Sequence, residues 1–380
     1  MKMKHVRIIT ILAASLAVIA ASLWAQTPTV WHNPLASAAG GEPYVCGRAW
    51  NAETGANFHR LPARCNGVVP EGVWNLSLHS AGLSLRFSTN SSVIRVGYRL
   101  AAGWPHYFNM TWMDSSGADL YGKDARGRMR WIGNSANVKI EGDSATITYS
   151  GIRYPRGLEG GTEFRLYLPA YNEVRSLNIG VESGARFAFL HEERQRPLVV
   201  YGTSIVHGSS PSRPGLMFTN IVGRELDIPV VNLGFSGKAF LEPEMFNLIA
   251  EVDAAAFVID PVANSFRVKD EMVERTCYGV RRLRSASAAP ILMVESRVPT
   301  DSLFRPAYAH RYTDANRLFR EAYDKLRAEG VKGLYYLSAV DLGLTEESLI
   351  EGSHPNDLGN IEYARAYIKA LKKALKSARK

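Results

Sequence analysis

The stretch PLVVYGTSIVHGSS, residues 197–210, lies a little past the middle of this 380-residue chain. Its apolar run from Leu198 to Tyr201 is typical of a buried strand in a parallel sheet, and the run ends at Gly202. Ser204 follows at the turn. Because the functional residues of open α/β sheets gather at the carboxyl ends of strands, Ser204 is a candidate nucleophile as well as an ordinary turn residue.

The sequence after residue 196 repeats this pattern. Short apolar runs alternate with amphipathic stretches of helical periodicity, which indicates a parallel sheet covered by helices on both faces. The apolar runs are PLVVYG, PVVNLGF, AAAFVID, PILMVES and GLYYLSA. We therefore expect residues 196–380 to form one α/β domain with three layers.

The preceding part of the chain, residues 30–190, has a different period. Runs such as LSLRFS, VIRVGY and FRLYLP alternate apolar with polar residues, and turn signals such as SSG and LEGG separate them. Many short strands with hardly a helical stretch predict a β-sandwich of the jelly-roll kind. The charged stretch HEERQRP, residues 191–197, is a suitable connector between the two domains.

Residues 1–25 have the composition of a secretory signal peptide. Three basic residues precede an uncharged apolar run from Ile8 to Trp24, and Ala25 offers a small-residue cleavage point. An uncleaved membrane anchor is the alternative, since the run approaches spanning length. We expect a secreted or periplasmic protein with no membrane attachment once the signal is removed.

The formal net charge of +9 does not indicate a nucleic-acid partner. Three of the positive charges belong to the predicted signal peptide. Many others lie in the tail RAYIKALKKALKSARK, whose apolar residues recur at helical spacing, so a helix with a solvated cationic face explains them. No nucleic-acid-binding motif accompanies this charge, and we expect no such partner.

Two of the three cysteines lie close together in the sequence. In an oxidising compartment Cys46 and Cys65 are expected to form a disulfide, which would stabilise the fold by roughly 3 kcal/mol. Cys277 falls in a predicted helix and is expected to be a small buried residue. Cysteines and histidines do not occur at the tight spacing of a metal site, so no metal is expected.

Three further strand ends carry polar groups, in GFSG, DPVAN and EGSHPND. The last of these contains His354 with Glu351 three residues earlier. A serine hydroxyl needs a base to take its proton, and the base needs an acid that orients it, so Ser204, His354 and Glu351 form a candidate triad. The backbone N–H groups of Ser204 and Gly237 and the side-chain amide of Asn264 are candidate donors for an oxyanion hole.

Two familiar motifs are excluded. The nucleophile elbow of α/β-hydrolases needs the pattern G-x-S-x-G, but Val206 stands where its second glycine would be. A phosphate-binding loop is excluded as well, because GTSIVHGSS has no Gly-Lys-Ser/Thr ending.

The four strand-end motifs resemble the conserved blocks of the SGNH, or GDSL-type, hydrolases. GTSI resembles the first block with Ser204 as nucleophile, NLGFSG the second with Gly237, VANS the third with Asn264, and EGSHPNDLG the last with His354. YGTSIVHGSSPSRPGLMFTN and GADLYGKD resemble a branch in which a β-sandwich precedes the catalytic domain. The resemblance implies a flavodoxin-like α/β/α domain, ester hydrolysis through an acyl-serine intermediate, and no metal or organic cofactor.

Three positions depart from the usual family blocks. Val262 and Ser265 stand near Asn264 where the family has glycine and aspartate, and Glu351 replaces the usual aspartate. Asp341, at the end of the last predicted strand, is therefore an alternative acid for the triad.

The same branch is similar to bacterial carbohydrate acetylesterases, so the resemblance implies an acetylated carbohydrate or another small ester as substrate. Arg213 and Arg297 follow strands and are candidates for contacting it. Two other functions are consistent with the sequence. One is hydrolysis of a lipid or thioester by the same triad, and the other is glycan binding by a protein whose altered blocks have lost catalysis.

Overall fold

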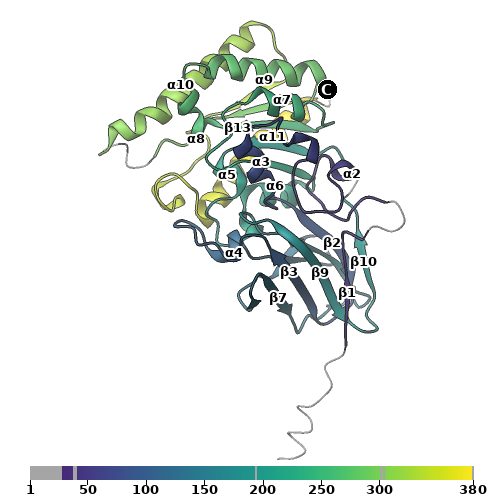
Figure 1. Ribbon diagram of the computed structural model, residues 1–380. Helices are drawn as coiled ribbons and strands as arrows, with labels where there is room; N and C mark the ends of the chain where they lie inside the picture. Colours follow the sequence, from purple (N-terminus) through teal and green to yellow (C-terminus); the bar gives the residue numbers. More distant parts are fainter. Residues whose placement is uncertain (1–27, 37–40, 193–194, 300–301, 303, 379–380) are drawn as a thin grey trace, which may run out of the picture.

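The computed structural model describes residues 28–36, 41–192, 195–299, 302 and 304–378. The predicted signal peptide therefore lies outside the described residues. Within those ranges, no helix has both the length and the apolar character needed to cross a bilayer. Figure 1 shows an antiparallel β region joined to a second region of strands and helices.

Among its described residues, the β region contains ten strands, whose bounds are β1 (Thr29–His32), β2 (Ser84–Thr89), β3 (Ile94–Leu100), β4 (Asp119–Lys123), β5 (Met129–Gly133), β6 (Lys139–Glu141), β7 (Ser144–Tyr149), β8 (Thr162–Tyr167), β9 (Val174–Glu182) and β10 (Phe187–Leu190). They form two antiparallel sheets with the orders β1-β9-β3-β7-β6 and β10-β2-β8-β4-β5. Without the edge strands β6 and β10, this is the interleaved strand order of a jelly roll. The predicted sandwich is confirmed.

The period of two in the sequence places one side of each sheet in a shared core. In β3, Ile94, Val96 and Tyr98 are buried, while the residues between them are more exposed. Leu85 and Phe87 of β2 belong to the same cluster, from the opposite sheet. Burial of each such large apolar side chain contributes about 2 kcal/mol, so this alternation holds the two sheets together.

The second region is built on a parallel sheet of five strands, β11 (Leu198–Gly202), β12 (Val230–Gly234), β13 (Ala256–Asp260), β14 (Ile291–Val294) and β15 (Leu334–Leu337). Their order is β12-β11-β13-β14-β15, which is the flavodoxin-like order. Val199 and Tyr201 pack into the core on one face of the sheet, whereas Leu198 and Val200 pack into the core on the other. Burial on both faces explains why these strands are continuous apolar runs, and the predicted α/β/α domain is confirmed.

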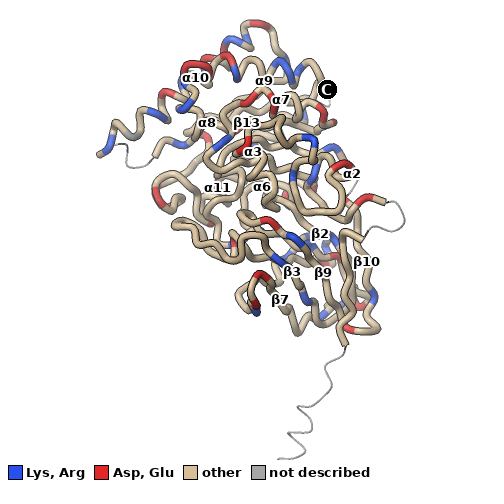
Figure 2. Tube along the Cα trace, in the orientation of Figure 1, with Lys and Arg blue, Asp and Glu red and all other residues tan. Residues whose placement is uncertain are grey.

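Helices cover both faces of this sheet (Figure 1). One core contains residues of α7 (Pro243–Ile249), α9 (Met272–Ala286) and α10 (Pro306–Ala328), and the other contains residues of α6 (Phe218–Leu226) and α11 (Asp357–Ala378). Figure 2 shows basic and acidic residues interspersed along α9 and α10. The basic tail is helical as predicted as far as Ala378, because α11 buries an apolar stripe and its lysines lie outside that stripe.

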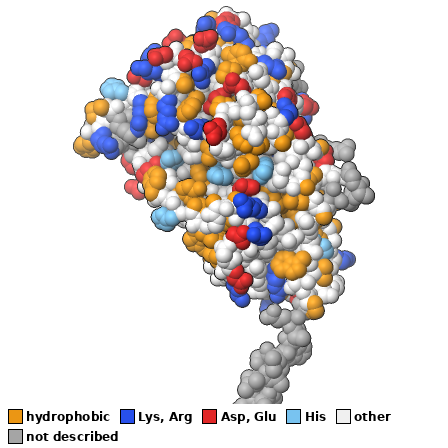
Figure 3. Space-filling view, in the orientation of Figure 1, with side chains coloured by type: hydrophobic (Ala, Val, Ile, Leu, Met, Phe, Trp, Pro, Cys, Tyr) orange, Lys and Arg blue, Asp and Glu red, His pale blue; other side chains and the backbone are white. Residues whose placement is uncertain are grey.

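The outer surface is mixed in character. On the face drawn in Figure 3, apolar side chains are dispersed among charged and polar ones. Such dispersed apolar groups are usual on folded proteins, because polar atoms alone do not cover a globular surface.

A segment between β1 and β2 leaves the sandwich, although it falls inside the range 30–190. It forms α2 (Asn51–Thr54), η1 (Ala63–Cys65) and α3 (Glu71–Ser77), which lie beside the second region in Figure 1. Leu61, Val69 and Val73 from this segment are buried in the same core as Val231 of β12. The segment therefore ties the two regions together through apolar contacts.

Arg60 strengthens this connection with hydrogen bonds. Its guanidinium donates to the carbonyl oxygens of Leu76 and His79 within the segment. It also donates to the carbonyl oxygens of Asn232 and Gly234 at the end of β12. Burial lowers the pKa of Arg60 to about 9, so the group stays charged at neutral pH and its bonds are charge-assisted.

The predicted disulfide between Cys46 and Cys65 is absent, since both cysteines are free and buried. Cys46 forms an antiparallel bridge with Ser84 at the start of β2. Cys65 instead belongs to the core of the parallel sheet, together with Val73. The prediction was wrong because the chain between the two cysteines crosses from one region to the other. Cys277 is buried in α9, as expected.

We predict that Arg60→Leu lowers the free energy of unfolding by about 3 kcal/mol or more, because four carbonyl groups lose a buried donor. The control is Arg64→Leu. Arg64 forms ion pairs with Glu53 and Glu251, but its side chain is 45% exposed, and exposed ion pairs contribute at most about 1 kcal/mol. Urea unfolding of both variants measures the difference, and equal losses would contradict the prediction.

Candidate active site

The three candidate triad residues meet at the carboxyl edge of the parallel sheet. Ser204 is the first residue of the short helix α5 (Ser204–His207), which begins directly after β11. Its Oγ lies 2.7 Å from Nε2 of His354. On the other side of the ring, Nδ1 of His354 hydrogen-bonds to Oε1 of Glu351, which also accepts the backbone N–H of His354 at 3.1 Å. The arrangement can transfer a proton from the serine to the imidazole.

A tight loop before α11 holds the acid and the histidine together. Leu349 and Pro355 form an antiparallel bridge, and the backbone N–H of Ile350 donates to the carbonyl of His354 at 2.9 Å. These bonds close the loop around Glu351, so its carboxylate faces the imidazole. The spacing of three residues is therefore set by local backbone structure.

The alternative acid, Asp341, has other partners. It is exposed, and its carboxylate accepts a hydrogen bond from the hydroxyl of Ser338 at 2.6 Å. Its backbone N–H donates back to the same hydroxyl at 3.2 Å. Asp341 thus closes the turn that follows β15, while Glu351 contacts His354.

The candidate oxyanion donors lie on loops that follow neighbouring strands. β11 is paired with β12 on one side and with β13 on the other, so the loops after all three strands share one edge. As the first residue of α5, Ser204 has a backbone N–H without an acceptor inside the helix. Gly237 has φ of +66°, a conformation that favours glycine.

Asn264 is joined to the loop of Gly237. It lies in α8 (Val262–Ser265), and its Nδ2 donates to the carbonyl of Lys238 at 2.8 Å. The amide nitrogen has a second hydrogen, which remains available for an oxyanion. Val262 and Ser265, the two departures from the family block, are both buried, and the Ser265 hydroxyl donates to Pro261. The short helix accommodates both residues.

Tyr171, which sequence reasoning missed, supports the nucleophile from the β region. Its hydroxyl donates to the carbonyl of Ser204 at 3.3 Å. Its ring stacks on the buried ring of His207 with centroids 4.1 Å apart, and Nδ1 of His207 accepts the backbone N–H of Ser236. Burial holds the pKa of His207 well below its usual value, so this histidine is neutral and packs beneath the site.

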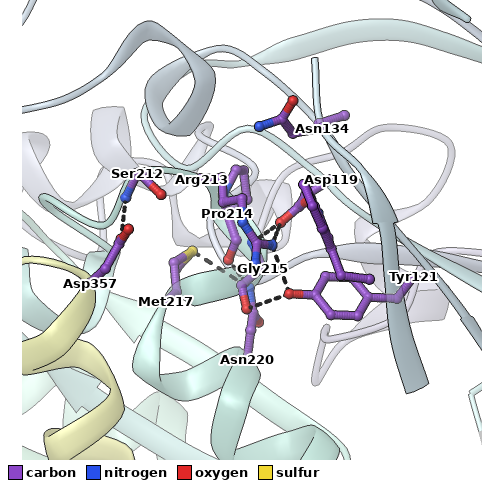
Figure 4. Close-up of polar contacts among 12 residues, drawn as sticks. Asp119, Tyr121, Asn134, Ser212, Arg213, Pro214, Gly215, Met217, Asn220 and Asp357 are labelled. Atoms are coloured by element: carbon purple, nitrogen blue, oxygen red, sulfur yellow. Dashed lines mark hydrogen bonds and ion pairs between the residues drawn. The ribbon is translucent and has the colours of Figure 1, made fainter. Parts of the chain in front are cut away.

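Arg213 lies where the β region contacts the α/β domain, and its guanidinium is paired with side chains of the β region (Figure 4). It forms an ion pair with Asp119 of β4 and donates to the hydroxyl of Tyr121 at 2.7 Å. Asp119 is fully buried and also accepts the backbone N–H of Gly215 at 3.0 Å. Asp119 and Tyr121 belong to the GADLY motif, whose polar groups thus hold the loop after α5. Contact of the half-buried Arg297 with a substrate stays a prediction.

Comparison with known proteins agrees with this architecture. Residues 195–372 match the profile of the GDSL-like lipase/acylhydrolase family, and residues 29–187 match a domain described as the N-terminus of the SGNH hydrolase type of esterase. The chain belongs to the SGNH, or GDSL-type, hydrolase family. No curated protein sequence matches the chain of this SGNH hydrolase.

Solved structures share the fold of this SGNH hydrolase. A candidate GDSL-like lipase from Bacteroides ovatus is 29% identical, with a TM-score of 0.81 over 92% of this chain and 98% of the other. The salicylyl-acyltransferase SsfX3 from a tetracycline biosynthetic pathway is 17% identical, with a TM-score of 0.71 over 91% and 97%. A family two carbohydrate esterase from Cellvibrio japonicus is 12% identical, with a TM-score of 0.53 over 92% and 99%. The last two show the common fold alone.

We predict that Arg213→Met destabilises the enzyme by about 3 kcal/mol, because it leaves the buried carboxylate of Asp119 without its cation. The KM for a small ester should stay close to that of the wild type. Arg99→Met, which breaks an exposed pair with Asp143, is the matched control and should leave the stability close to that of the wild type. A raised KM with unchanged thermal stability would instead assign Arg213 to substrate binding.

Proposed function

We propose that this SGNH hydrolase is a secreted serine esterase that removes short acyl groups, chiefly acetyl, from a carbohydrate. The observation that carries the proposal is the continuous chain of contacts from the Ser204 hydroxyl through His354 to Glu351. This chain contains a nucleophile, a base and an orienting acid, which are the components of acyl transfer to serine.

In the first half of the reaction, Nε2 of His354 takes the proton of Ser204 as Oγ attacks the carbonyl carbon of the ester. The negative charge on the carbonyl oxygen is held by the backbone N–H groups of Ser204 and Gly237 and by the amide of Asn264. Glu351 stabilises the imidazolium. His354 then gives its proton to the departing alcohol, and the acyl group stays on Ser204.

Water completes the turnover. His354 takes a proton from a water molecule, whose oxygen attacks the acyl carbon. The second tetrahedral intermediate collapses, Oγ of Ser204 regains a proton from His354, and the carboxylic acid leaves. All steps use groups of this chain and one water molecule.

A carbohydrate substrate is supported by a feature beside the triad. Phe108 is 85% exposed and precedes Asn109, whose amide nitrogen is 3.4 Å from Nδ1 of His354. An exposed aromatic ring at the edge of the site suits contact with the apolar face of a sugar ring. The signal-like composition of residues 1–25 supports action outside the cytoplasm. The fold shared with family two carbohydrate esterases is consistent with this choice.

The proposal is tested with a series of nitrophenyl esters of increasing acyl length, assayed on the wild type and on Ser204→Ala. We expect the highest kcat/KM for acetate, a steep fall for longer chains, and a loss of roughly 10⁴-fold or more in the serine variant. A preference for long chains would favour a lipid or thioester hydrolase. Absence of any Ser204-dependent turnover would favour a glycan-binding protein that has lost catalysis. Acetate release from a panel of acetylated polysaccharides then identifies the glycan.

We predict that Glu351→Gln lowers kcat at least a hundredfold, because the imidazole loses the charge that orients it and stabilises its protonated form. Asp341→Asn should retain kcat within about threefold, since its carboxylate bonds to Ser338. Both changes remove one negative charge from a carboxylate near the same sheet edge, so they are matched. The reverse ranking would assign the acid role to Asp341.

A further inference from the structure

A loop of the β region reaches the candidate catalytic histidine. Residues 101–111 connect β3 with α4 (Trp112–Ser115) and contain no regular secondary structure. Within this loop Asn109 is only 8% exposed, and its amide nitrogen lies 3.4 Å from Nδ1 of His354. The same nitrogen lies 3.4 Å from the hydroxyl of Ser209. One amide of the β region therefore touches both the base and the segment that follows the nucleophile.

The loop is fixed in this place by contacts on both sides of Asn109. The hydroxyl of Tyr107 donates to the carbonyl of Tyr171 at 3.2 Å, and Met110 packs against the cluster that contains Met217. The hydroxyl of Thr111 donates to the carbonyl of Ser212 at 2.7 Å. Anchors at three neighbouring positions restrict how far the amide can move from His354.

Ser209 connects this amide with the nucleophile. Its backbone N–H donates to the carbonyl of Ser204 at 2.9 Å, and its side chain is buried. Asn109 thus lies between two groups that must keep a fixed separation, the imidazole of His354 and the backbone of Ser204. A residue in this place can hold the distance over which the proton is transferred.

The chemistry at Nδ1 decides which end of the amide faces the ring. Nδ1 donates its proton to Glu351, so an amide N–H would find no lone pair there. In the flipped orientation of the amide, which exchanges Nδ2 and Oδ1, Oδ1 would lie at this point, able to accept from the Ser209 hydroxyl and facing the Nδ1–H group. An acceptor there stabilises the imidazolium that forms when His354 takes the serine proton.

We propose that Asn109 is a positioning residue for His354, so that the β region completes the catalytic machinery of the α/β domain. The inference rests on the proposed function, since it assigns His354 as the base. Among the described contacts of the ring, Glu351 at Nδ1 is the titratable group. The hydroxyl of Ser204 lies at Nε2, and the uncharged amide of Asn109 approaches from the β region.

Two substitutions separate a positioning role from a merely structural one. Asn109→Leu keeps the approximate volume and removes the amide, so kcat should fall about tenfold at unchanged KM, and the acid limb of kcat/KM should move to lower pH. Asn109→Asp adds a second carboxylate beside the imidazole, which should move the acid limb about one pH unit higher. The control Asn66→Asp adds the same charge at an exposed position and should change neither kcat nor the acid limb of kcat/KM.

Opposite shifts in the two variants support the proposal, whereas an unchanged acid limb in both overturns it, however much activity is lost. The imidazole titration of His354, followed by NMR in the Ser204→Ala background, reads the same contact without turnover. There Asn109→Asp should raise the titration midpoint, and an unmoved midpoint would overturn the inference. Absence of Ser204-dependent turnover in the wild type would contradict the proposed function alone, because the NMR titration still tests the contact.

Discussion

Close packing of the nucleophile helix on the strand ends is the constraint from which the site follows. A Cβ atom at Gly202 would lie 2.5 Å from Cγ2 of Val206 in α5 and 2.5 Å from the carbonyl oxygen of Asp260 at the end of β13. A Cβ atom at Gly234 would lie 2.0 Å from the backbone nitrogen of His207 in α5. The contacts with Asp260 and His207 involve backbone, so moving a flexible side chain cannot relieve them. Without these two glycines α5 could not sit on the sheet, and Ser204 would not face His354. Gly202 of GTSI and Gly234 of NLGFSG are thus required because no Cβ atom fits at either position.

A second constraint is the burial of polar groups where the β region meets the α/β domain. Arg60 and the pair of Asp119 with Arg213 are largely withdrawn from water, and each is stable there only because its partners are all in place. Such contacts add less net stability than apolar ones would, but they fix a single relative placement of the two regions. That placement determines where Tyr171 and Asn109 lie relative to Ser204.

Period and strand-end position made much of the fold predictable. The alternation in β3 shows that one face of the strand is buried, and the continuous apolar run of β11 shows that two faces are buried. The antiparallel sandwich and the parallel sheet could therefore both be predicted from the sequence. The contact between Ser204 and His354 followed from the rule that functional groups gather at strand ends. The prediction of a disulfide was wrong because spacing in the sequence does not determine the path of the chain between Cys46 and Cys65.

Contacts between the two regions were not predictable, for a related reason. Asn109, Tyr171 and Arg60 lie in stretches whose local pattern is that of ordinary loops or strand ends, and their partners lie far along the chain. The structural role of Arg213 was missed for the same reason, since its partner, Asp119, belongs to the other region. The GADLY string was the one signal available, because a buried Asp in a strand needs a cation.

These contacts also determine what kind of unit the β region is. Val73 lies in the same core as the parallel sheet, and Arg60 binds carbonyl groups at the end of β12. Removal of the β region would expose that apolar core to water and leave those carbonyl groups without hydrogen-bond donors. The α/β domain therefore depends on the β region to cover part of its core. The β region is therefore structurally part of the catalytic unit. A sugar-binding role for Phe108 would depend on the same contacts, because they hold its loop beside the triad.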